Sequence, residues 1–580
     1  LRRPMPMLRL SEGREVRYAN VDEMPHIVRA YNAIILPRTV EGLRSHGLRV
    51  YATTCFQSRL VTARQIPPLR ATIRGRSMIV RDHLAGNICA VDVESVNAML
   101  NAFQAVVISP PVSDLEGLGA LNVDADVLAA EMANHLEADH LRLVTSTRGV
   151  LPDLSSPDVA ATDLGPGEGY RYACGRMRQK VRAAELALEG PSDVAICGPH
   201  SLSVATRFWR IAHPQPDVEL LARAVEISSV STDEHELAQY LYDWASRSGL
   251  SAQIDTVGNL IVTKGAGPFR LLMMGHLDTV PHRWPPSWDN GCVHGRGSVD
   301  AKGSLVAFLN ALAMIEVPEG MQVQVVGAVE EENTSEGAFK FACNTRPPDA
   351  VIIGEPSGAH ALTVAYHGLV KLQLTTVGRA GHTAGQGVTT AADALVEAIM
   401  TVRQTVAQMS PRSLTATLGT EARNRFDRQQ GAAIVDVRIA PGTTPESVIS
   451  AVEASLPDGV NLKVLRATPP VTTARSCGLV RAFSRAFRGA GISPRFLAKK
   501  GSSDMNTLAS RWSAEIPMVA YGPGDSSLDH TSAECLDAQE FLDSVAVVTQ
   551  AVRLWLDSVT DLTKPTIESD NVITNSGGSD

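Results

Sequence analysis

Apolar, strand-like runs alternate with helical segments in the second half of the sequence, and this pattern restricts the possible folds more than any other feature. The runs are LLMMGHL (271–277), VQVVGAV (323–329) and AVIIGE (350–355), and SLVAFLNALAMI (304–315) has the length of a helix. Short apolar runs without polar alternation are typical of strands that are buried on both faces, as in a parallel sheet covered by helices. The second half is therefore expected to have an α/β fold around a largely parallel sheet.

The chain has 580 residues, which is too long for one ordinary core, so we expect several domains. Two prolines in HPQPD, residues 213–217, interrupt the helical patterns on either side and mark a linker. A later stretch reads as strand, helix, strand, strand, helix, strand, which indicates a small α+β domain inserted into the larger one. The last segment is rich in Ser, Asn, Asp and Gly and is expected to be disordered. The expected limits are 1–213 for a first α/β domain, 216–362 and 475–558 for a second, 363–474 for the insertion and 559–580 for the tail.

Charge and cysteine content exclude several classes of function. The chain has 53 Lys and Arg against 62 Asp and Glu, so it lacks the basic surface that gathers nucleic acid or anionic lipid. Its eight cysteines form no Cys-x-x-Cys pair, which argues against a disulfide framework and a thiolate zinc site. No apolar run reaches the roughly 20 residues that span a bilayer. We expect a cytoplasmic protein with no nucleic-acid or membrane partner.

Histidines and carboxylates lie at the ends of the expected strands. Two imidazoles and several carboxylates at such positions can hold two divalent ions about 3.5–4 Å apart when one carboxylate bridges them. The chemistry that this pattern predicts is metal-assisted hydrolysis. The candidates are His276, Asp278, Asp300, Glu330, Glu331, Glu332, Glu355 and His530.

The order of five motifs adds a family resemblance. H-x-D, D-x-K-G, E-E, G-E-P and D-H-T follow one another through residues 216–558, which resemble the ArgE/DapE/carboxypeptidase G/aminoacylase family of co-catalytic metallopeptidases. The resemblance implies two divalent ions, zinc or cobalt, that share one bridging carboxylate. By this similarity the ligands are His276, Asp300 and Glu355 for one ion, and Asp300, Glu332 and His530 for the other.

The same resemblance implies two further roles. Asp278, two residues from His276 and on the same side of the strand, would hold the imidazole in the required tautomer. Glu331 would be the general base that takes a proton from the attacking water and later gives it to the leaving amine. The family's usual motif is Asp-Glu-Glu where this chain has Glu-Glu-Glu, and the register of the downstream residues, Ser335 to Ala338, favours Glu331 over its neighbours.

Two other segments resemble parts of the family that contact the substrate. The inserted stretch resembles the family's lid and dimerisation domain, and GRAGHTA places His382 where relatives reach a substrate from the lid. KKGSSDMNTLA, which begins at 499, resembles the substrate loop, with Ser503, Asp504 and Asn506 as candidate contacts to a released amino acid. We therefore expect a homodimer that forms through the lid.

The first half carries a second resemblance. GALNVDADVLAAEMANHLEADHLRLVTSTRGVLPD and YACGRMRQKVRAAELAL resemble the C-terminal two-thirds of the amino-acid kinase family, closest to acetylglutamate kinases and their carrier-protein counterparts. In such enzymes a carboxylate organises active-site lysines, and one lysine neutralises the transferred phosphoryl group. Carried over by motif, these residues are Asp126 and Lys180, while Asn122 and Arg17 match positions that hold the substrate.

The first half departs from this family at its phosphate loops. Family members have two Gly-Gly loops whose backbone N–H groups approach the phosphates, and the only Gly-Gly pair here is at 577–578. We therefore expect little or no kinase activity, with ATP and Mg bound only if this half is functional. Two explanations remain open, namely a truncated fusion enzyme or a domain that survives as a scaffold.

The pairing of the two halves narrows the substrate. A kinase for an N-blocked acidic amino acid acts early in arginine or lysine synthesis, and a hydrolase that removes the blocking group acts last. The blocking group is either the γ-glutamyl end of an acidic amino-group carrier protein or a small acyl group, as in N-acetylornithine deacetylase or succinyl-diaminopimelate desuccinylase. We favour the carrier, because G-E-P-S-G and S-S-D-M-N resemble the carrier-dependent branch. A basic cluster would steer this acidic partner: Arg171, Arg176, Arg178, Lys180 and Arg182.

Overall fold

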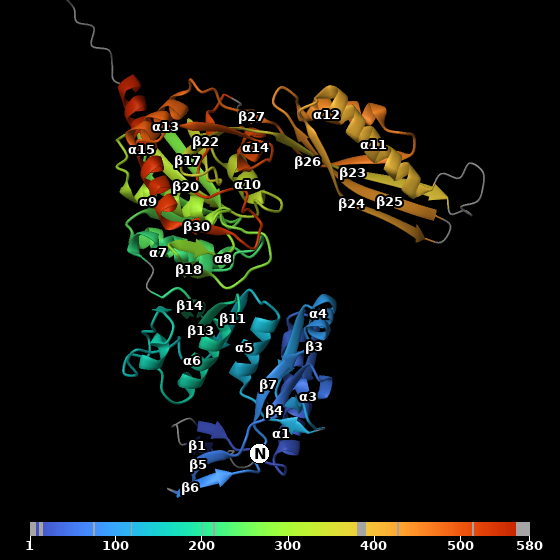
Figure 1. Ribbon diagram of the computed structural model, residues 1–580, viewed down its shortest axis with the longest axis vertical. Helices are drawn as coiled ribbons and strands as arrows, with labels where there is room; N and C mark the ends of the chain where they lie inside the picture. Colours follow the sequence, from blue (N-terminus) through green and yellow to red (C-terminus); the bar gives the residue numbers. More distant parts are fainter. Residues whose placement is uncertain are drawn as a thin grey trace, which may run out of the picture. The chain divides into compact units, whose positions relative to one another are not determined.

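The computed structural model describes residues 7–10, 15–73, 76–117, 119–199, 201–212, 215–379, 390–425, 428–512 and 515–563 (Figure 1). The chain forms two compact units. The first contains Leu1–Gln215 with Glu226–Ser228 and His282–Trp288, and the second contains Pro216–Val225, Ser229–Pro281 and Asp289–Asp580. Among the residues described, no helix combines the length and the apolar character needed to cross a membrane.

The first unit consists of short strands and helices. In chain order they are β1 (Met7–Leu10), β2 (Glu15–Arg17), α1 (Met24–Ala30), a π-helix (Tyr31–Ile35), α2 (Leu36–Ser45), β3 (Val50–Thr54), α3 (Cys55–Ser58), β4 (Val61–Gln65), β5 (Leu69–Ile73), β6 (Arg76–Val80), β7 (Gly86–Val91), α4 (Val93–Ala102), β8 (Ala105–Ser109), β9 (Val112–Asp114), β10 (Ala120–Leu121), α5 (Ala125–His135), β11 (His140–Val144), β12 (Asp163–Leu164), a 3-10 helix (Glu168–Arg171), α6 (Gly175–Ala187), β13 (Asp193–Gly198) and β14 (Ser201–Phe208). The strands form the sheets β2-β1-β5-β6, β10-β9-β4-β7, β3-β8 and β11-β13-β14-β12.

Helices α5 and α6 pack against each other and against β11 and β13. Small side chains such as Ala130 and Ala183, together with Val181, are fully buried in this core and allow the close approach. Asp124 caps α5, because its carboxylate accepts hydrogen bonds from backbone N–H groups of the first turn, including that of Asp126. This cap holds the start of α5 beside α6.

The second unit is built on a nine-stranded sheet with the order β15-β16-β20-β17-β21-β29-β22-β27, in which β28 also pairs with β22. Its strands are β15 (Ser251–Ile254), β16 (Leu260–Gly265), β17 (Phe269–His276), β20 (Met321–Ala328), β21 (Ala350–Ile353), β22 (Ala361–Tyr366), β27 (Val471–Thr472), β28 (Arg495–Lys499) and β29 (Met518–Ala520). A small sheet joins β18 (Ser287–Asp289), β19 (Cys292–His294) and β30 (Cys535–Asp537). The helices are α7 (Glu219–Glu226), α8 (His235–Arg247), α9 (Lys302–Met314), α10 (Glu336–Asn344), α13 (Gly478–Gly489), α14 (Asp504–Ala509) and α15 (Ala538–Thr563).

The centre of this sheet is parallel, as the apolar runs predict. β17 pairs in parallel with β20 and with β21, and β21 pairs in parallel with β29. All four residues of β21 are buried, so both of its faces are covered. The expected α/β class of the second half is confirmed, with β16 and β15 added in antiparallel fashion at one edge.

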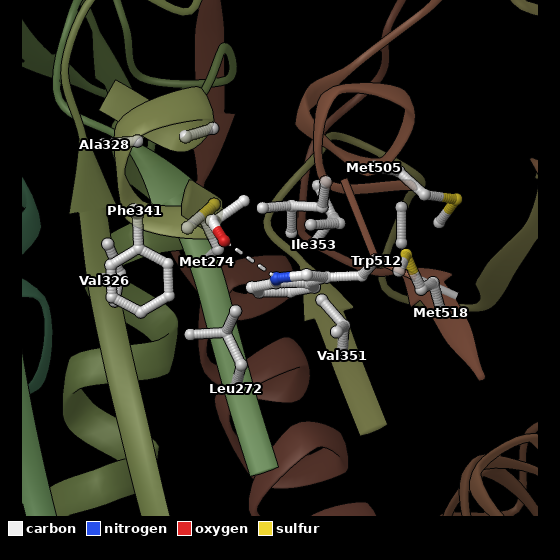
Figure 2. Close-up of a cluster of buried hydrophobic side chains, with 14 of the residues drawn as sticks. Leu272, Met274, Val326, Ala328, Phe341, Val351, Ile353, Met505, Trp512 and Met518 are labelled. Atoms are coloured by element: carbon white, nitrogen blue, oxygen red, sulfur yellow. Dashed lines mark hydrogen bonds between the residues drawn. The ribbon is translucent and has the colours of Figure 1, made fainter. Parts of the chain in front are cut away.

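Alternate residues of the central strands point to two helical layers. Leu272 and Met274 of β17 face α10 and α14 in one apolar core, which also contains Trp512 (Figure 2). On the opposite face, Gly275 lies against Leu305 of α9, which packs on α15. Successive side chains of a strand point to opposite faces of the sheet. Each face is therefore covered by its own layer of helices, which gives the αβα arrangement.

The inserted domain is an antiparallel sheet with the order β24-β25-β23-β26. Its apolar face is covered by α11 and α12 (Figure 1). The predicted order of strands and helices is found, but the predicted limits 363–474 are too wide. Residues 363–366 of β22 and the whole of β27 fall within those limits, and both strands pair in the main sheet. The elements are β23 (Gly368–Arg379), α11 (Ala391–Met409), β24 (Leu414–Arg425), β25 (Arg428–Ile439), α12 (Pro445–Ser455) and β26 (Val460–Thr468).

The start of the predicted tail needs a correction. Helix α15 continues to Thr563, so residues 559–563 are helical rather than disordered. Apolar residues of this helix, such as Trp555 and Leu556, are buried and carry it past the composition change. Residues 564–580 lie outside the described part of the chain.

Trp512 offers a test of how the core of the second unit is held. Its side chain is 7% exposed, contacts Phe341 edge-on at 6.4 Å between ring centroids, and donates from Nε1 to the carbonyl of Ala342 at 3.1 Å. Trp512→Ala should lower the free energy of unfolding by about 3–5 kcal/mol, because it opens a cavity and leaves that carbonyl unpaired. Denaturant titration measures this loss.

The matched control is Tyr172→Ala, which removes an aromatic side chain that is 40% exposed and should cost less than about 1 kcal/mol. Equal losses in the two variants would contradict the assignment of Trp512 to the core.

Candidate metal centre

Three parallel strands, β17, β20 and β21, end at the same edge of the main sheet. The loops that follow them meet there because parallel strands place their carboxyl ends together. Two residues from other loops complete the group, one ahead of α9 and one ahead of β30. The residues are His276 at the end of β17, Asp278 after β17, Glu331 and Glu332 after β20, Glu355 after β21, and Asp300 and His530 from the other loops.

Asp300 lies at the centre of this group. One carboxylate oxygen, Oδ1, is 3.2 Å from Nε2 of His276, and the other, Oδ2, is 3.2 Å from Nε2 of His530. His530 Nε2 is also 2.9 Å from Oε1 of Glu332. Ligand atoms of Asp300, Glu332 and His530 all lie within 4.8 Å of one another. Each oxygen of Asp300 thus faces a different imidazole, which is the arrangement that a bridging carboxylate requires.

The imidazole of His276 has a defined tautomer. Its Nδ1 lies 2.9 Å from the backbone carbonyl of Asp278, which can only accept a hydrogen bond, and 3.3 Å from Oδ1 of the same residue. Nδ1 therefore carries a proton, and Nε2 is the ring nitrogen that faces Asp300 and would bind a metal ion. Both the backbone and the carboxylate of Asp278 thus orient this ring.

The carboxylate of Asp278 also holds the loop after β20. It accepts hydrogen bonds from the backbone N–H groups of Glu331 and Glu332, both at 3.0 Å, and from the hydroxyl of Ser231 at 2.6 Å. Burial alone would raise the pKa of Asp278, but the hydrogen bonds from His276 and from these donors hold it below its ordinary value. Asp278 therefore connects one candidate ligand to the loop that carries the others.

This loop has an unusual backbone. Glu330 and Ser335 adopt positive φ values of 58° and 54°, and His530 does so at 63°. Non-glycine residues in this region cost of order 1–3 kcal/mol and persist where surrounding contacts hold them. The Ser335 N–H donates to the Glu330 carbonyl at 2.6 Å and closes the loop around Glu331 and Glu332.

The charges of the group indicate what it can bind. Burial raises the pKa of Glu331, Glu332 and Glu355, for Glu332 to about 8, and repulsion by Asp300 contributes to each. Burial also tends to raise the pKa of Asp300. Hydrogen bonds from the two histidines outweigh this effect and hold the pKa of Asp300 well below the usual range. Several carboxylates so close together are costly to bury unless cations neutralise them. Carboxylate oxygens and imidazole nitrogens are suitable donors for divalent transition metals, so the residues fit two such ions.

Glu534 is a further residue of the site that the motifs did not reveal. Its buried carboxylate accepts hydrogen bonds from the backbone N–H groups of Val299 at 3.0 Å and Asp300 at 3.1 Å, and from Arg296 at 2.8 Å. Arg296 in turn donates to the backbone carbonyl of His530 at 3.4 Å. The pair therefore fixes the backbone on both sides of the centre. The only sequence signal was the position of Glu534 four residues after His530.

The predicted substrate contacts differ in whether their side chains are already hydrogen-bonded within the protein. Ser503 and Asn506 form the capping box of α14, and the Asn506 amide also donates to the carbonyls of His367 and Pro469. These two side chains therefore hold the loop in place. Asp504 is buried, and its Oδ1 has no hydrogen-bond partner within the described residues, so it is free to meet a ligand. His382 lies outside the described residues.

The kinase-like residues are partly brought together in the first unit. Lys180 of α6 donates to the Asp126 carboxylate of α5 at 2.7 Å. Asn122 uses its backbone, donating to the carbonyl of Leu84 and accepting from Gly86. The side chain of Arg17 is outside the described residues.

Two members of the basic cluster have partners within the chain. Lys180 is bound to Asp126, and Arg178 stacks 5.4 Å from the ring centroid of Tyr170. The remaining members are exposed on the surface of the first unit, namely Arg171, Arg176 and Arg182.

Comparison with known proteins finds one family match in each half of the chain. Residues 272–554 match the model of peptidase family M20/M25/M40, and residues 6–197 match that of the amino acid kinase family. The chain is 37% identical to the LysW-lysine hydrolase of Deinococcus radiodurans, in an alignment that covers 58% of this chain and 98% of that protein. It is 34% identical to a putative LysW-lysine/LysW-ornithine hydrolase of Pyrococcus furiosus, covering 58% of this chain and 96% of the relative.

Solved structures share the fold of the second half. An M20 family metallo-carboxypeptidase from Sulfolobus solfataricus has a TM-score of 0.50 at 16% identity and covers 59% of this chain and 100% of its own. A tripeptidase from Staphylococcus aureus has a TM-score of 0.51 at 17% identity, covering 59% and 98%. The second half of the chain thus shares its fold with these solved structures.

Glu534→Ala should weaken metal binding by about 10- to 100-fold, because the backbone of Asp300 and the side chain of Arg296 lose their shared acceptor. Competition with a chromophoric chelator measures this affinity for zinc or cobalt. Glu336→Ala is the control, since it removes an exposed carboxylate that pairs only with Lys340 on its own helix. Unchanged affinity in Glu534→Ala would refute the positioning role.

Proposed function

Because the chain belongs to peptidase family M20/M25/M40, with an amino acid kinase family segment ahead of the hydrolase, we propose that it releases lysine or ornithine from an acidic amino-group carrier protein. The bond broken is the amide between the γ-carboxyl of the carrier's terminal glutamate and the α-amino group of the amino acid. The supporting observation is the bridging geometry of Asp300 in a chain that spans 98% and 96% of relatives named as hydrolases of LysW conjugates.

The alternative is a hydrolase of a small N-acyl amino acid, namely an N-acetylornithine deacetylase or a succinyl-diaminopimelate desuccinylase. Either reaction needs a metal-dependent amide hydrolase, and either can use the same donors around Asp300. The two reactions differ in the acyl group that is removed from the amino acid. The names of the relatives support the carrier conjugate.

The metal ligands would be those that surround Asp300. His276 and Glu355 would join it at one ion, and Glu332 and His530 at the other, and we propose zinc or cobalt on the basis of these imidazole and carboxylate donors. When bound, the ions supply a Lewis acid for the scissile carbonyl and lower the pKa of a water molecule.

Glu331 is the general base in this proposal. Its backbone is fixed by the hydrogen bond from its N–H to Asp278, and burial raises the pKa of its carboxyl above the ordinary value. A raised pKa brings a carboxylate closer to neutrality, where it can accept a proton from water and then deliver it to the leaving nitrogen. Asp278 contributes by holding both His276 and the Glu331 backbone.

Lysine or ornithine release can be tested directly with the metal-loaded protein. We expect release from carrier-conjugated lysine or ornithine at low micromolar concentration, much faster than from acetylornithine. Glu331→Gln should lose about 100-fold or more of this rate while still binding metal, because only the proton transfer is removed. Faster turnover of acetylornithine would overturn the carrier and leave a deacetylase, and full activity in Glu331→Gln would overturn the assignment of the base.

We also propose that the protein forms a homodimer through the inserted domain. β24 is an edge strand of that sheet, and apolar side chains on and around it are exposed, with Leu418 57% and Leu414 44% exposed. A long edge strand with exposed apolar residues favours pairing with another chain.

The eight unpaired cysteines fit the reducing cytoplasm that we propose as the location.

Leu418→Lys should convert a dimer into a monomer, because it places a charge on the exposed edge. Light scattering after gel filtration measures the mass. Val159→Lys is the matched control, since Val159 is exposed to a similar extent, 61%, on the first unit. A mass that stays dimeric in Leu418→Lys, or a monomeric wild type, would count against this interface.

A further inference from the structure

The chain crosses between the main sheet and the inserted sheet at two places that lie side by side. β22 leads into β23 through His367 alone, and β26 returns to β27 through Pro469 and Pro470. On the main-sheet side β22 pairs antiparallel with β27, and on the inserted side β23 pairs antiparallel with β26. The two crossings therefore form one antiparallel ribbon that is interrupted between the two sheets (Figure 1).

The interruption follows from the residues at the crossings. Proline has no backbone N–H, so neither Pro469 nor Pro470 can donate a hydrogen bond to the facing strand. The two segments also approach closely, since a Cβ on Gly368 would lie 2.6 Å from the nitrogen of Pro470 and from the carbonyl oxygen of Thr468. Backbone carbonyls buried at this point therefore need a hydrogen-bond donor from another part of the chain.

Asn506 supplies that donor. Its side chain is fully buried, and its Nδ2 donates to the carbonyl of His367 at 3.0 Å and to that of Pro469 at 2.8 Å. One side-chain amide thus holds one residue of each crossing. Its Oδ1 is engaged separately, because it accepts a hydrogen bond from the backbone N–H of Ser503 at 2.9 Å in the capping box of α14. The donor end of Asn506 therefore serves the crossings, and the acceptor end serves the helix.

The crossings determine where β26 lies relative to the catalytic loops. Arg466 lies two residues before the end of β26 and donates to the hydroxyls of Ser335 at 2.6 Å and Thr507 at 3.0 Å. The N–H of Ser335 closes the loop around Glu331, and the positive charge of Arg466 acts on the Glu331 carboxyl. A change in the orientation of the insertion would therefore move Arg466 relative to the proposed general base.

We propose that Asn506 is a positioning residue: by holding both crossings, its side-chain amide sets the orientation of the inserted domain relative to the metal centre. The two crossings are the covalent links between the insertion and the main sheet. A small rotation there displaces the far parts of the insertion by a larger distance, so a constraint at this point is effective. The expected effect on turnover rests on the proposed function, whereas the orientation itself can be measured without substrate.

Two variants separate this role from helix capping. Asn506→Asp keeps an oxygen that accepts from the Ser503 N–H, but it replaces the donating amide by an oxygen that repels the carbonyls of His367 and Pro469. Asn506→Ser loses the same two donors without burying a charge, so it tests the same point if the buried carboxylate prevents folding. A residue that only stabilised the fold would lower stability in both variants without changing the orientation.

The orientation is measured on the metal-loaded full chain by pulsed dipolar EPR. Spin labels are attached to p-acetylphenylalanine introduced at Val396 of α11 and at Met314 of α9, whose side chains are 61% and 49% exposed. A thiol label is unsuitable, because Cys343 is exposed and would react as well. Labelled chain is diluted with unlabelled chain, so that only distances within one chain are recorded. Wild type should give one narrow distribution, and both variants should broaden it or shift its mean by more than about 2 Å.

Turnover shows whether the orientation matters for the reaction. Both variants should lose about 10- to 100-fold in kcat for release of lysine from the carrier conjugate, because a displacement of about 1 Å is enough to cost that much. Their affinity for zinc should stay at the wild-type value, since the proposed ligands lie on loops of the main sheet. A loss of kcat without a loss of metal affinity is the pattern of a residue that positions the insertion.

Thr390→Ala is the matched control. Thr390 forms the capping box of α11 with Asp393 inside the insertion, so this variant loses a cap but keeps both crossings. It should retain the wild-type label distance and kcat. A wild-type distance distribution in folded Asn506 variants, or a shifted distribution with wild-type kcat, would overturn this inference alone. Release of no amine by wild type would overturn the proposed function, and the label distances would still decide whether Asn506 sets the orientation.

Discussion

The crowding of carboxylates around Asp300 is the constraint to which the rest of the second unit is adapted. Glu331, Glu332 and Glu355 are partly buried near it, and this burial together with mutual repulsion raises the pKa of each. Two histidines offset part of this charge, and two divalent ions would offset the rest. The parallel sheet makes the crowding possible, because it directs three loops to one edge.

Two acidic residues that are not proposed ligands keep this group in place. Asp278 binds the backbone of Glu331 and Glu332, and Glu534 binds the backbone of Asp300. Each is almost fully buried and each accepts several hydrogen bonds, so the loops are held by charged acceptors rather than by apolar packing. The inserted domain adds Arg466 of β26, which donates hydrogen bonds to the hydroxyls of Ser335 at 2.6 Å and Thr507 at 3.0 Å. The centre is thus built from the sheet edge, its supporting carboxylates and one arginine of the insertion.

The sequence was most informative where the relevant pattern is local. Apolar runs located β17, β20 and β21, and motif order located residues that the structure brings together around Asp300. Features that depend on distant contacts could not be read in the same way. The role of Glu534 arises from its contact with a loop more than 200 positions earlier, and that of Arg466 from the packing of β26 beside Ser335. Ser503 and Asn506 fitted a substrate motif, but a capping box has the same spacing, and only the structure separates the two.

The boundaries of the insertion show the same limitation. Only His367 separates β22 from β23, although β22 pairs in the main sheet and β23 in the inserted sheet. Helix α15 extends beyond the composition change at residue 559, and the buried side chains of Trp555 and Leu556 hold the turn before that point. In both cases tertiary contacts set an end point that local sequence could not.

The central claim is that Asp300 is shared by two divalent ions. Anomalous diffraction from crystals of the zinc-loaded protein tests it most directly, with data on both sides of the zinc absorption edge. Two peaks about 3.5–4 Å apart are expected with Asp300 between them, with His276 and Glu355 at one peak and Glu332 and His530 at the other. A single peak, or two peaks that do not share Asp300, would contradict it.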